Sequence, residues 1–274
     1  MDERPIGVFD SGVGGLTVLH ECLVTLPHED FVYFGDSAPD RFPYGPKPPE
    51  VIRRFAHEIA AHLVARGVKL MVVACNSATA AALPDLQREF EVPLIGVITP
   101  EARAAVQATR SRRIGVMATE ATVDSGRYPS AILALDAGAD VTQVACPALV
   151  PLIQAGDTHG VEILEAAKSY ARPLKDGGVD TVILGCTHYP LIRPMLQRIF
   201  GRGVTVITSA EEIAREVAVT VDRRGVGNDP AREGAYHFLC TGDEEAFSEV
   251  AGRFLQLPLT DVERVDPARL AVAA

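Results

Sequence analysis

Apolar positions along the chain fall into two alternating patterns. Short continuous runs rich in Val, Ile and Leu predict buried strands over 5–9, 31–35, 69–75, 93–98, 113–118, 140–146, 181–186 and 204–208. Between them the apolar residues recur at helical spacing, which predicts helices over 15–25, 49–66, 78–90, 100–109, 127–137, 160–176, 190–200 and 209–223. A further strand (235–240) and helix (243–255) are expected near the end. Near-continuous apolar strands joined by helices are typical of parallel sheets covered on both faces, so the sequence predicts an α/β fold.

Two of the predicted strands end in similar motifs. The stretches "MVVACNSATAA" (71–81) and "VILGCTHYPL" (182–191) each run from apolar residues through a small residue into a cysteine and then a polar residue. Gly-Val plus a charged residue precedes both runs. This indicates an internal duplication with one thiol at a strand's carboxyl end in each half. Ligands of open α/β sheets bind at that edge, so we expect a cleft with one cysteine on each wall.

Composition and charge narrow the function. A chain of 274 residues forms one large domain or two ordinary ones, and 47% hydrophobic with 23% charged residues is typical of a globular protein. The net charge of −10 repels the phosphate backbone, so nucleic acid is not an expected partner. No apolar run reaches the roughly 18–20 residues of a membrane helix, and the start lacks a secretory signal, so we expect a cytoplasmic protein.

The five cysteines are scattered and form no C-x-x-C pair, so free thiols and no zinc site are expected. Cys22, Cys146 and Cys240 are interpreted as small buried hydrophobes. Cys75 and Cys186 are the functional candidates, because hydrogen-bonding side chains and a helix start or turn follow each. A helix amino terminus lowers the pKa of a thiol, so we expect both to ionise readily.

Three further features supply polar groups. His188 follows Cys186 by two residues and is fixed by Pro190, which places it to polarise that thiol or a substrate. In "FDSGVGGLT" (9–17), Asp10 follows a strand and three glycines allow a tight turn into a helix. The turn lacks both G-x-G-x-x-G and a Walker lysine, so it predicts a small-carboxylate site in which Ser11 and backbone amides donate. The segment "FPYGPKPP" (42–49) reads only as a rigid turn that carries Tyr44 and Gly45.

Two thiols on separate walls indicate a reaction that uses two bases. One thiolate removes a proton α to a carboxylate and the other thiol returns one to the opposite face, which inverts the stereocentre. A hydrolytic nucleophile needs only one cysteine with a base, whereas a redox pair needs the sulfurs about 2 Å apart. Two bases at roughly 3–3.5 Å from one carbon hold the sulfurs about 6–7 Å apart. The spacing in sequence does not decide between these, but placement on separate halves favours two bases.

The motifs "DSGVGGLT", "YFGD…PYG", "ACNSATA", "CPALVPLI" and "LGCTHYPL", in this order, resemble the bacterial glutamate racemase family. The resemblance implies a cofactor-independent and metal-free isomerase that supplies D-glutamate for peptidoglycan. It implies that Cys75 and Cys186 are the acid/base thiols, assisted by Asp10 and His188. The residues implied to bind glutamate are Asp10, Ser11, Tyr44, Gly45, Asn76, Ser77, Thr187 and His188. It further implies two pseudo-symmetric α/β domains around the site, 1–98 with 209–274 and 99–208, and a homodimer.

Three departures from the family pattern stand out. Ser77 replaces the usual threonine, which keeps a hydroxyl. The loop before Tyr44 is about two residues longer, and Gln154 stands where the family usually has glutamate, so it supplies no charge. The sequence leaves open a racemase of the same fold that acts on aspartate or a related acid, a thiol redox protein, and a regulatory binding protein that has lost turnover.

Overall fold

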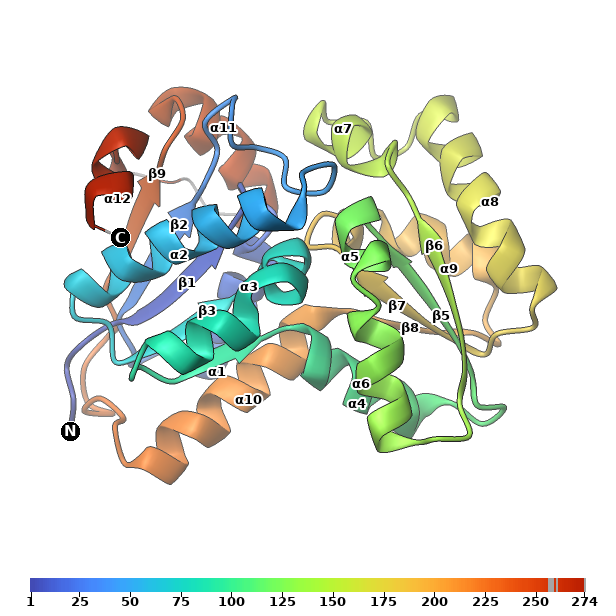
Figure 1. Ribbon diagram of the computed structural model, residues 1–274, viewed down its shortest axis with the longest axis horizontal. Helices are drawn as coiled ribbons and strands as arrows, with labels where there is room; N and C mark the ends of the chain where they lie inside the picture. Colours follow the sequence, from blue (N-terminus) through green and yellow to red (C-terminus); the bar gives the residue numbers. More distant parts are fainter. Residues whose placement is uncertain (256–258, 260, 274) are drawn as a thin grey trace.

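The computed structural model describes residues 1–255, 259 and 261–273, and it contains two parallel sheets (Figure 1). The first has the strand order β10-β9-β2-β1-β3-β4 and the second the order β6-β5-β7-β8. The strands are β1 (Ile6–Asp10), β2 (Phe31–Gly35), β3 (Leu70–Val73), β4 (Leu94–Gly96), β5 (Arg113–Ala118), β6 (Asp140–Ala145), β7 (Thr181–Gly185), β8 (Thr205–Ile207), β9 (Tyr236–Cys240) and β10 (Val262–Arg264). The predicted α/β fold with parallel sheets is confirmed.

Helices join the strands and cover the sheets. They are α1 (Leu16–Thr25), α2 (Pro49–Ala65), α3 (Asn76–Glu89), α4 (Ile98–Ala108), α5 (Glu120–Asp124), α6 (Arg127–Leu135), α7 (Leu149–Gln154), α8 (Val161–Asp176), the 3₁₀ helix η1 (Tyr189–Ile192), α9 (Arg193–Phe200), α10 (Ser209–Arg224), α11 (Glu244–Leu255) and α12 (Pro267–Ala273). Strands β1, β2, β3 and β7 are buried along their whole length, which explains their uninterrupted apolar sequence. Within the described residues, no helix is both long and apolar enough to cross a membrane.

The two sheets share one strand order. Segments β2-β1-β3-β4 and β6-β5-β7-β8 both run second, first, third, fourth in chain order. The thiols Cys75 and Cys186 follow β3 and β7, which is the third strand of each set. This agreement is what an internal duplication leaves behind. The chain order reverses between the first and third strands, and such a reversal is where open α/β sheets bind ligands.

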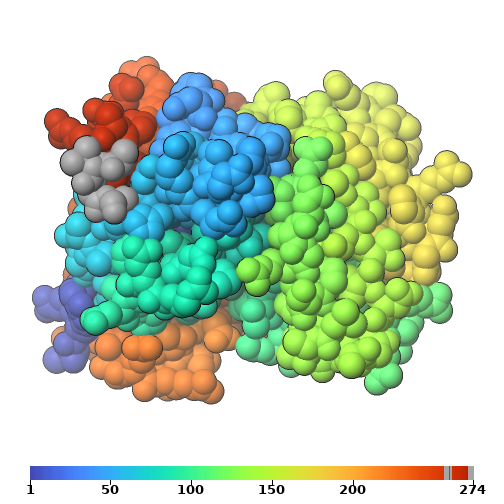
Figure 2. All heavy atoms as spheres, in the orientation of Figure 1, coloured from blue at the N-terminus to red at the C-terminus, as the bar shows by residue number. Residues whose placement is uncertain are grey.

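The chain passes between the two sheets twice. Helix α4 leads from β4 of the first sheet to β5 of the second, and α10 leads from β8 back to β9. These two crossing helices contact each other. Figure 2 shows the result on the surface, where the two ends of the chain share one side and the middle forms the other. The boundaries predicted at 98/99 and 208/209 fall at the starts of the crossing helices and stay a prediction.

Several elements differ from the sequence-based expectation. Helices α5, α7 and α12 and strand β10 were not predicted, because they are too short to show a clear period. The helix expected over 190–200 begins as the 3₁₀ helix η1, in which Pro190 lies near the start, and continues as α9 from Arg193. Helix α3 begins at Asn76, two residues earlier than expected, and this makes Cys75 its N-cap residue.

Candidate active site

A cavity of about 120 Å³ lies at the carboxyl edges of both sheets and is lined by residues from each. Asp10 lies buried beside the cavity. All the other predicted site residues line it, namely Ser11, Tyr44, Gly45, Cys75, Asn76, Ser77, Cys186, Thr187 and His188. The strand register explains their meeting. Phe9 pairs with Val73 and Ala118 with Gly185, so the residues that follow these strands emerge at common edges. The volume suits a ligand of amino-acid size.

Cys75 is held at the start of α3. Its Sγ accepts a hydrogen bond from the Ala78 amide at 3.5 Å, and its thiol donates to Ser11 Oγ at 3.6 Å. Burial nevertheless raises the pKa of Cys75, and together with the charge of Asp10 it brings that pKa to about 12. The expected lowering of the thiol pKa is therefore wrong for the unliganded protein. The amide bond does favour the thiolate, but the loss of solvation outweighs it.

Cys186 lies at the end of β7, with its Sγ 4.0 Å from His188 Nδ1. Burial raises the pKa of Cys186 well above its ordinary value, and charge on Cys75 raises it further. This electrostatic contact shows that the two thiols share one environment. All five cysteines are buried free thiols.

His188 is oriented by its second ring nitrogen. His188 Nε2 lies 3.1 Å from Gln154 Oε1, at the end of α7. An amide oxygen can only accept, so Nε2 carries the proton and Nδ1 presents a lone pair toward Cys186. Burial lowers the pKa of His188 to about 4, so the ring is neutral at neutral pH. His188 therefore faces the thiol as a hydrogen-bond acceptor.

Asp10 connects the two halves of the site. Its Oδ2 accepts from the Gly12 amide at 3.0 Å, and its Oδ1 accepts from the Thr187 hydroxyl at 3.3 Å. Burial raises the pKa of Asp10 to about 6, so the carboxylate is ionised at neutral pH. The glycine turn behind it fits closely against the second half. A Cβ on Gly14 would overlap Thr187 Oγ1 and lie 2.6 Å from His188 Nδ1.

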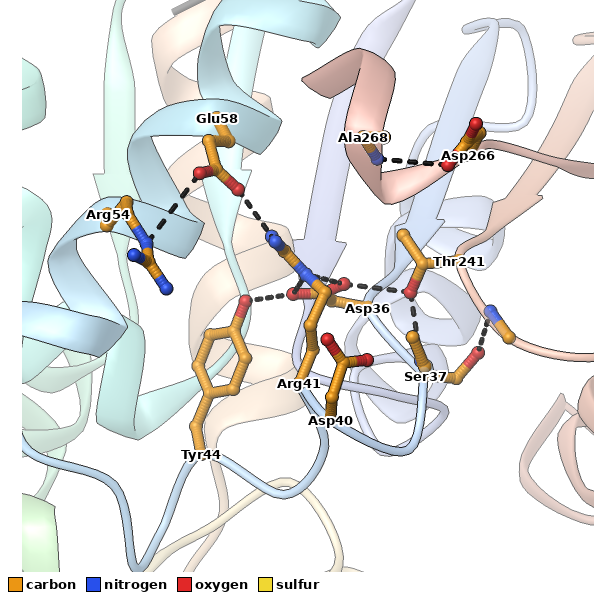
Figure 3. Close-up of polar contacts among 12 residues, drawn as sticks. Asp36, Ser37, Asp40, Arg41, Tyr44, Arg54, Glu58, Thr241, Asp266 and Ala268 are labelled. Carbon is orange, nitrogen blue, oxygen red and sulfur yellow. Dashed lines mark hydrogen bonds and ion pairs between the residues drawn. The ribbon is translucent and has the colours of Figure 1, made fainter. Parts of the chain in front are cut away.

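A buried ionic network holds the loop that carries Tyr44 (Figure 3). The Tyr44 hydroxyl donates to Asp36, which also accepts from Arg41 Nε at 2.7 Å and from the Thr241 hydroxyl at 2.8 Å. Arg41 Nη1 continues to Glu58 at 2.7 Å. The Tyr44 hydroxyl is therefore bonded away from the cavity, and any contact of Tyr44 with a ligand uses its ring or backbone. This network anchors the longer loop to α2 and to the end of β9.

A chain of hydroxyls joins the halves on the other side of the cavity. Ser77 Oγ lies 2.9 Å from Thr119 Oγ1, which lies 3.0 Å from Thr122 Oγ1. Thr119 directly follows β5, and Asp10 is the last residue of β1, so both lie at the carboxyl end of a strand. Thr119 was not predicted as a site residue because no distinctive sequence motif surrounds it. Asp36 was missed too, although its place directly after β2 was the available signal.

Other lining residues were also not predicted: Phe42, Pro43, Pro46, Thr119, Glu120, Cys146, Pro147, Val150, Pro151 and Gly185. Cys146 is fully buried as expected, and it also lines the cavity. Burial raises the pKa of Cys146 to about 12, and its carbonyl accepts from the Tyr189 hydroxyl at 3.2 Å. Across the part of the chain that the structure describes, no group of three or more His, Cys, Asp or Glu side chains could hold a metal ion.

The arrangement offers acid/base chemistry to a small ligand. Two thiols from two sheets, an ionised carboxylate next to one and a neutral imidazole next to the other all adjoin one cavity. Ser11 adds a hydroxyl donor, Thr187 adds a hydroxyl oxygen, and the start of α3 adds backbone amides. The site can therefore hold a charged amino acid while a proton is moved at one of its carbons.

Comparison with known proteins identifies the family of the chain. The sequence pattern of the family described as Asp/Glu/hydantoin racemase matches residues 11–217. A glutamate racemase of Parafrankia sp. is 47% identical over 263 residues, which cover 96% of this chain and 94% of the relative. One from Listeria monocytogenes is 43% identical, with 96% and 98% covered.

Solved structures of glutamate racemases have the same fold as this chain. A glutamate racemase of Bacillus anthracis superimposes with a TM-score of 0.92 at 39% identity and covers 97% of this chain and 99% of its own. One from Francisella tularensis, in complex with D-glutamate, gives a TM-score of 0.90 at 32% identity, with 97% and 98% covered. The chain therefore belongs to the Asp/Glu/hydantoin racemase family of isomerases, among the glutamate racemases.

Proposed function

We propose that the protein interconverts L- and D-glutamate by a two-thiol proton transfer and that the D-glutamate serves peptidoglycan synthesis. The observation that carries the mechanism is that Cys75 and Cys186, from two separate sheets, line one small cavity. The relatives and the complex with D-glutamate support the substrate. In the cell the protein would work in the cytoplasm as a homodimer, with glutamate as its small-molecule partner and no nucleic acid or membrane partner.

The reaction needs one thiolate and one thiol. The thiolate of one cysteine takes the α-proton of glutamate, and the electron pair of the broken C–H bond is left on the α-carbon. The thiol of the other cysteine then gives its proton to the opposite face, so the two cysteines exchange protonation states and the stereocentre is inverted. Burial weakens both thiols as acids, which makes each thiolate a stronger base.

Asp10 and His188 serve the two thiols differently in this proposal. The carboxylate of Asp10 is close enough to Cys75 to raise its pKa, and it also attracts the ammonium group of an amino acid. The neutral ring of His188 presents the Nδ1 lone pair to Cys186, so it accepts a hydrogen bond from the protonated thiol and orients that thiol. Ser11, Asn76, Ser77, Thr187 and the backbone at Tyr44 and Gly45 would also bind polar atoms of glutamate.

Circular dichroism of L-glutamate incubated with the purified protein tests the proposal. The signal is expected to decay to zero with no cofactor added. The same decay is expected when the protein has first been dialysed against EDTA and treated with hydroxylamine. Activity restored only by pyridoxal phosphate or a metal would contradict the two-thiol mechanism. The same assay with L-aspartate tests the alternative substrate, and no decay with any acid would leave a binding protein. A thiol count that falls on mild oxidation would favour the redox alternative.

The pH dependence of kcat/KM is expected to be bell-shaped. Activity is expected to rise with pH as one thiol ionises and to fall once the partner thiol loses its proton too, and protonation of Asp10 below about pH 6 lowers the activity further on the acid side. Because burial raises the pKa of both thiols, the optimum is expected near or above about pH 8.5, the ordinary pKa of a thiol. Rates at constant ionic strength from pH 5 to 10 measure this. A flat profile would argue against thiol chemistry.

Replacing Gln154 by glutamate is expected to raise the pKa of His188 from about 4 toward its ordinary value near 6.5. A carboxylate at the position of the amide, 3.1 Å from Nε2, stabilises the imidazolium. NMR titration of the His188 ring measures the change. Gln107→Glu is the matched control, since Gln107 is exposed on α4 and adds the same charge elsewhere. An equal shift of the His188 pKa in both variants would show that Gln154 does not act on His188 through the contact with Nε2.

A further inference from the structure

Glu101 is a fully buried acid that the proposed mechanism does not use. It lies on α4 and its Oε2 accepts from Asn76 Nδ2 at 3.2 Å and from the Tyr128 hydroxyl. Asn76 Nδ2 also donates to the Tyr128 oxygen at 2.7 Å. The three side chains come from α4, α3 and α6 and form a closed triangle of hydrogen bonds next to the ligand cavity, which Asn76 lines.

The triangle lies where the chain crosses between the sheets. Glu101 is in the first turn of the forward crossing helix α4. Ser209, the first residue of the return crossing helix α10, is close enough to lower the pKa of Glu101. Burial dominates and raises the pKa of Glu101 to about 8, and no positive charge is among the groups that shift it. The acid is therefore mostly uncharged at neutral pH, and its Oε1 is buried without a hydrogen-bond partner among the described residues.

The triangle decides how the Asn76 amide is turned. A primary amide has two N–H donors on one atom and one acceptor oxygen. Both contacts of Nδ2 go to Tyr128 and Glu101, and Asn76 Oδ1 is buried without a hydrogen-bond partner within the described part of the chain. The Asn76 atom without a partner is thus a hydrogen-bond acceptor, so a ligand group that binds it must be a hydrogen-bond donor.

Tyr128 alone could not fix this orientation. A phenol both donates and accepts, so it pairs equally well with either end of an amide. The Glu101 oxygen that faces the triangle only accepts, so it forces both the Tyr128 O–H and the Asn76 N–H to point toward it. We propose that Glu101 is a positioning residue that holds the Asn76 oxygen available to the ammonium group of the bound amino acid. This inference rests on glutamate as the proposed substrate.

A double-mutant cycle between Glu101 and Asn76 tests the inference. Glu101→Met keeps the volume but removes the acceptor, and kcat/KM for glutamate is expected to fall roughly 10-fold or more, mainly through KM. Glu101→Gln is the matched control, because its amide oxygen can accept as the acid does, and it is expected to stay near the parent. If Glu101 acts through Asn76, adding Glu101→Met to Asn76→Ala should cause no further loss.

Glutarate supplies a second measurement, because it has the carbon chain and both carboxylates of glutamate but no ammonium group. Glu101→Met is expected to weaken D-glutamate binding selectively and to leave inhibition by glutarate nearly unchanged. Equal weakening of both ligands, or additive losses in the cycle, would overturn the inference. If Glu101→Met does not fold, Glu101→Leu, which also removes the acceptor and leaves Tyr128 in place, must show the same selective loss. Absence of glutamate turnover by the parent would instead refute the proposed function.

Discussion

Replacing either Cys75 or Cys186 by serine is expected to reduce racemisation by roughly 10²- to 10⁴-fold or more. Inversion needs a base on one face of the α-carbon and an acid on the other, and the serine hydroxyl is too weak an acid and base to replace the thiol. Polarimetry of both enantiomers measures the loss. Because both thiols line one cavity from different sheets, neither is expected to take over the work of the other.

Each serine variant still has one thiol, which gives a sharper result than loss of activity. The remaining thiolate removes the proton from the face it reaches, exchanges with solvent and returns a deuteron to the same face. In heavy water, one variant should therefore wash the α-hydrogen out of L-glutamate only, and the other out of D-glutamate only, without inversion. Proton NMR of the α-position follows the exchange.

Cys240→Ser is the matched control for the two variants. Cys240 is equally buried, but it lies at the end of β9 and does not line the cavity. It is expected to lower stability slightly and to racemise at near the parent rate. If both active-site variants exchange the α-hydrogen of the same enantiomer, the assignment of one thiol to each face is wrong. The assignment is also wrong if either variant racemises glutamate at near the parent rate.

The sheet edges were predictable from sequence because their logic is local. An apolar run without polar interruption means a strand covered on both faces, and the first polar residue after it marks the carboxyl end. Asp10, Cys75 and Cys186 all stand at such ends, and the parallel register brings them to common edges. The duplicated cysteine motifs also indicated that the chain has two similar halves. In the structure each motif follows the third strand of a sheet segment with the same strand order.

The energetics of the site depend on long-range packing and were not predictable. The start of α3 does bond Cys75, but the surrounding core removes solvent and reverses the expected direction of the pKa. Asp36 and Glu101 carry no motif, and their partners lie in other elements, at Thr241 and at Asn76. A sequence pattern reports which face of an element is buried, but it does not report which polar groups meet there.

The sequence predicts a small-carboxylate site at the glycine turn 12–15, and the structure gives this turn a second role. In the structure Gly14 lies directly against Thr187 and His188, the two residues that follow Cys186. The Thr187 hydroxyl reaches from there to Asp10. The absence of a side chain at Gly14 is therefore what lets the Asp10 turn and the Cys186 turn approach each other.

Replacing Gly14 by alanine is expected to lower kcat/KM by roughly 10²-fold, the effect of displacing catalytic groups by about 1 Å. The new Cβ would overlap Thr187 Oγ1 and stand 2.6 Å from His188 Nδ1, so both side chains must shift. The overpacking is also expected to lower the free energy of unfolding by about 1–3 kcal/mol. Rates are measured well below the melting temperature, so that lost folding does not imitate lost activity.

Gly203→Ala is the matched control, because a Cβ at Gly203 meets no atom within 4 Å and its backbone is outside the left-handed region. It is expected to keep both stability and turnover. The pKa of His188, read by NMR, separates the two explanations for a loss in Gly14→Ala. A ring displaced toward solvent regains hydration, so its pKa should rise from about 4. A folded Gly14→Ala variant with the parent rate would show that the two turns need not approach so closely for catalysis.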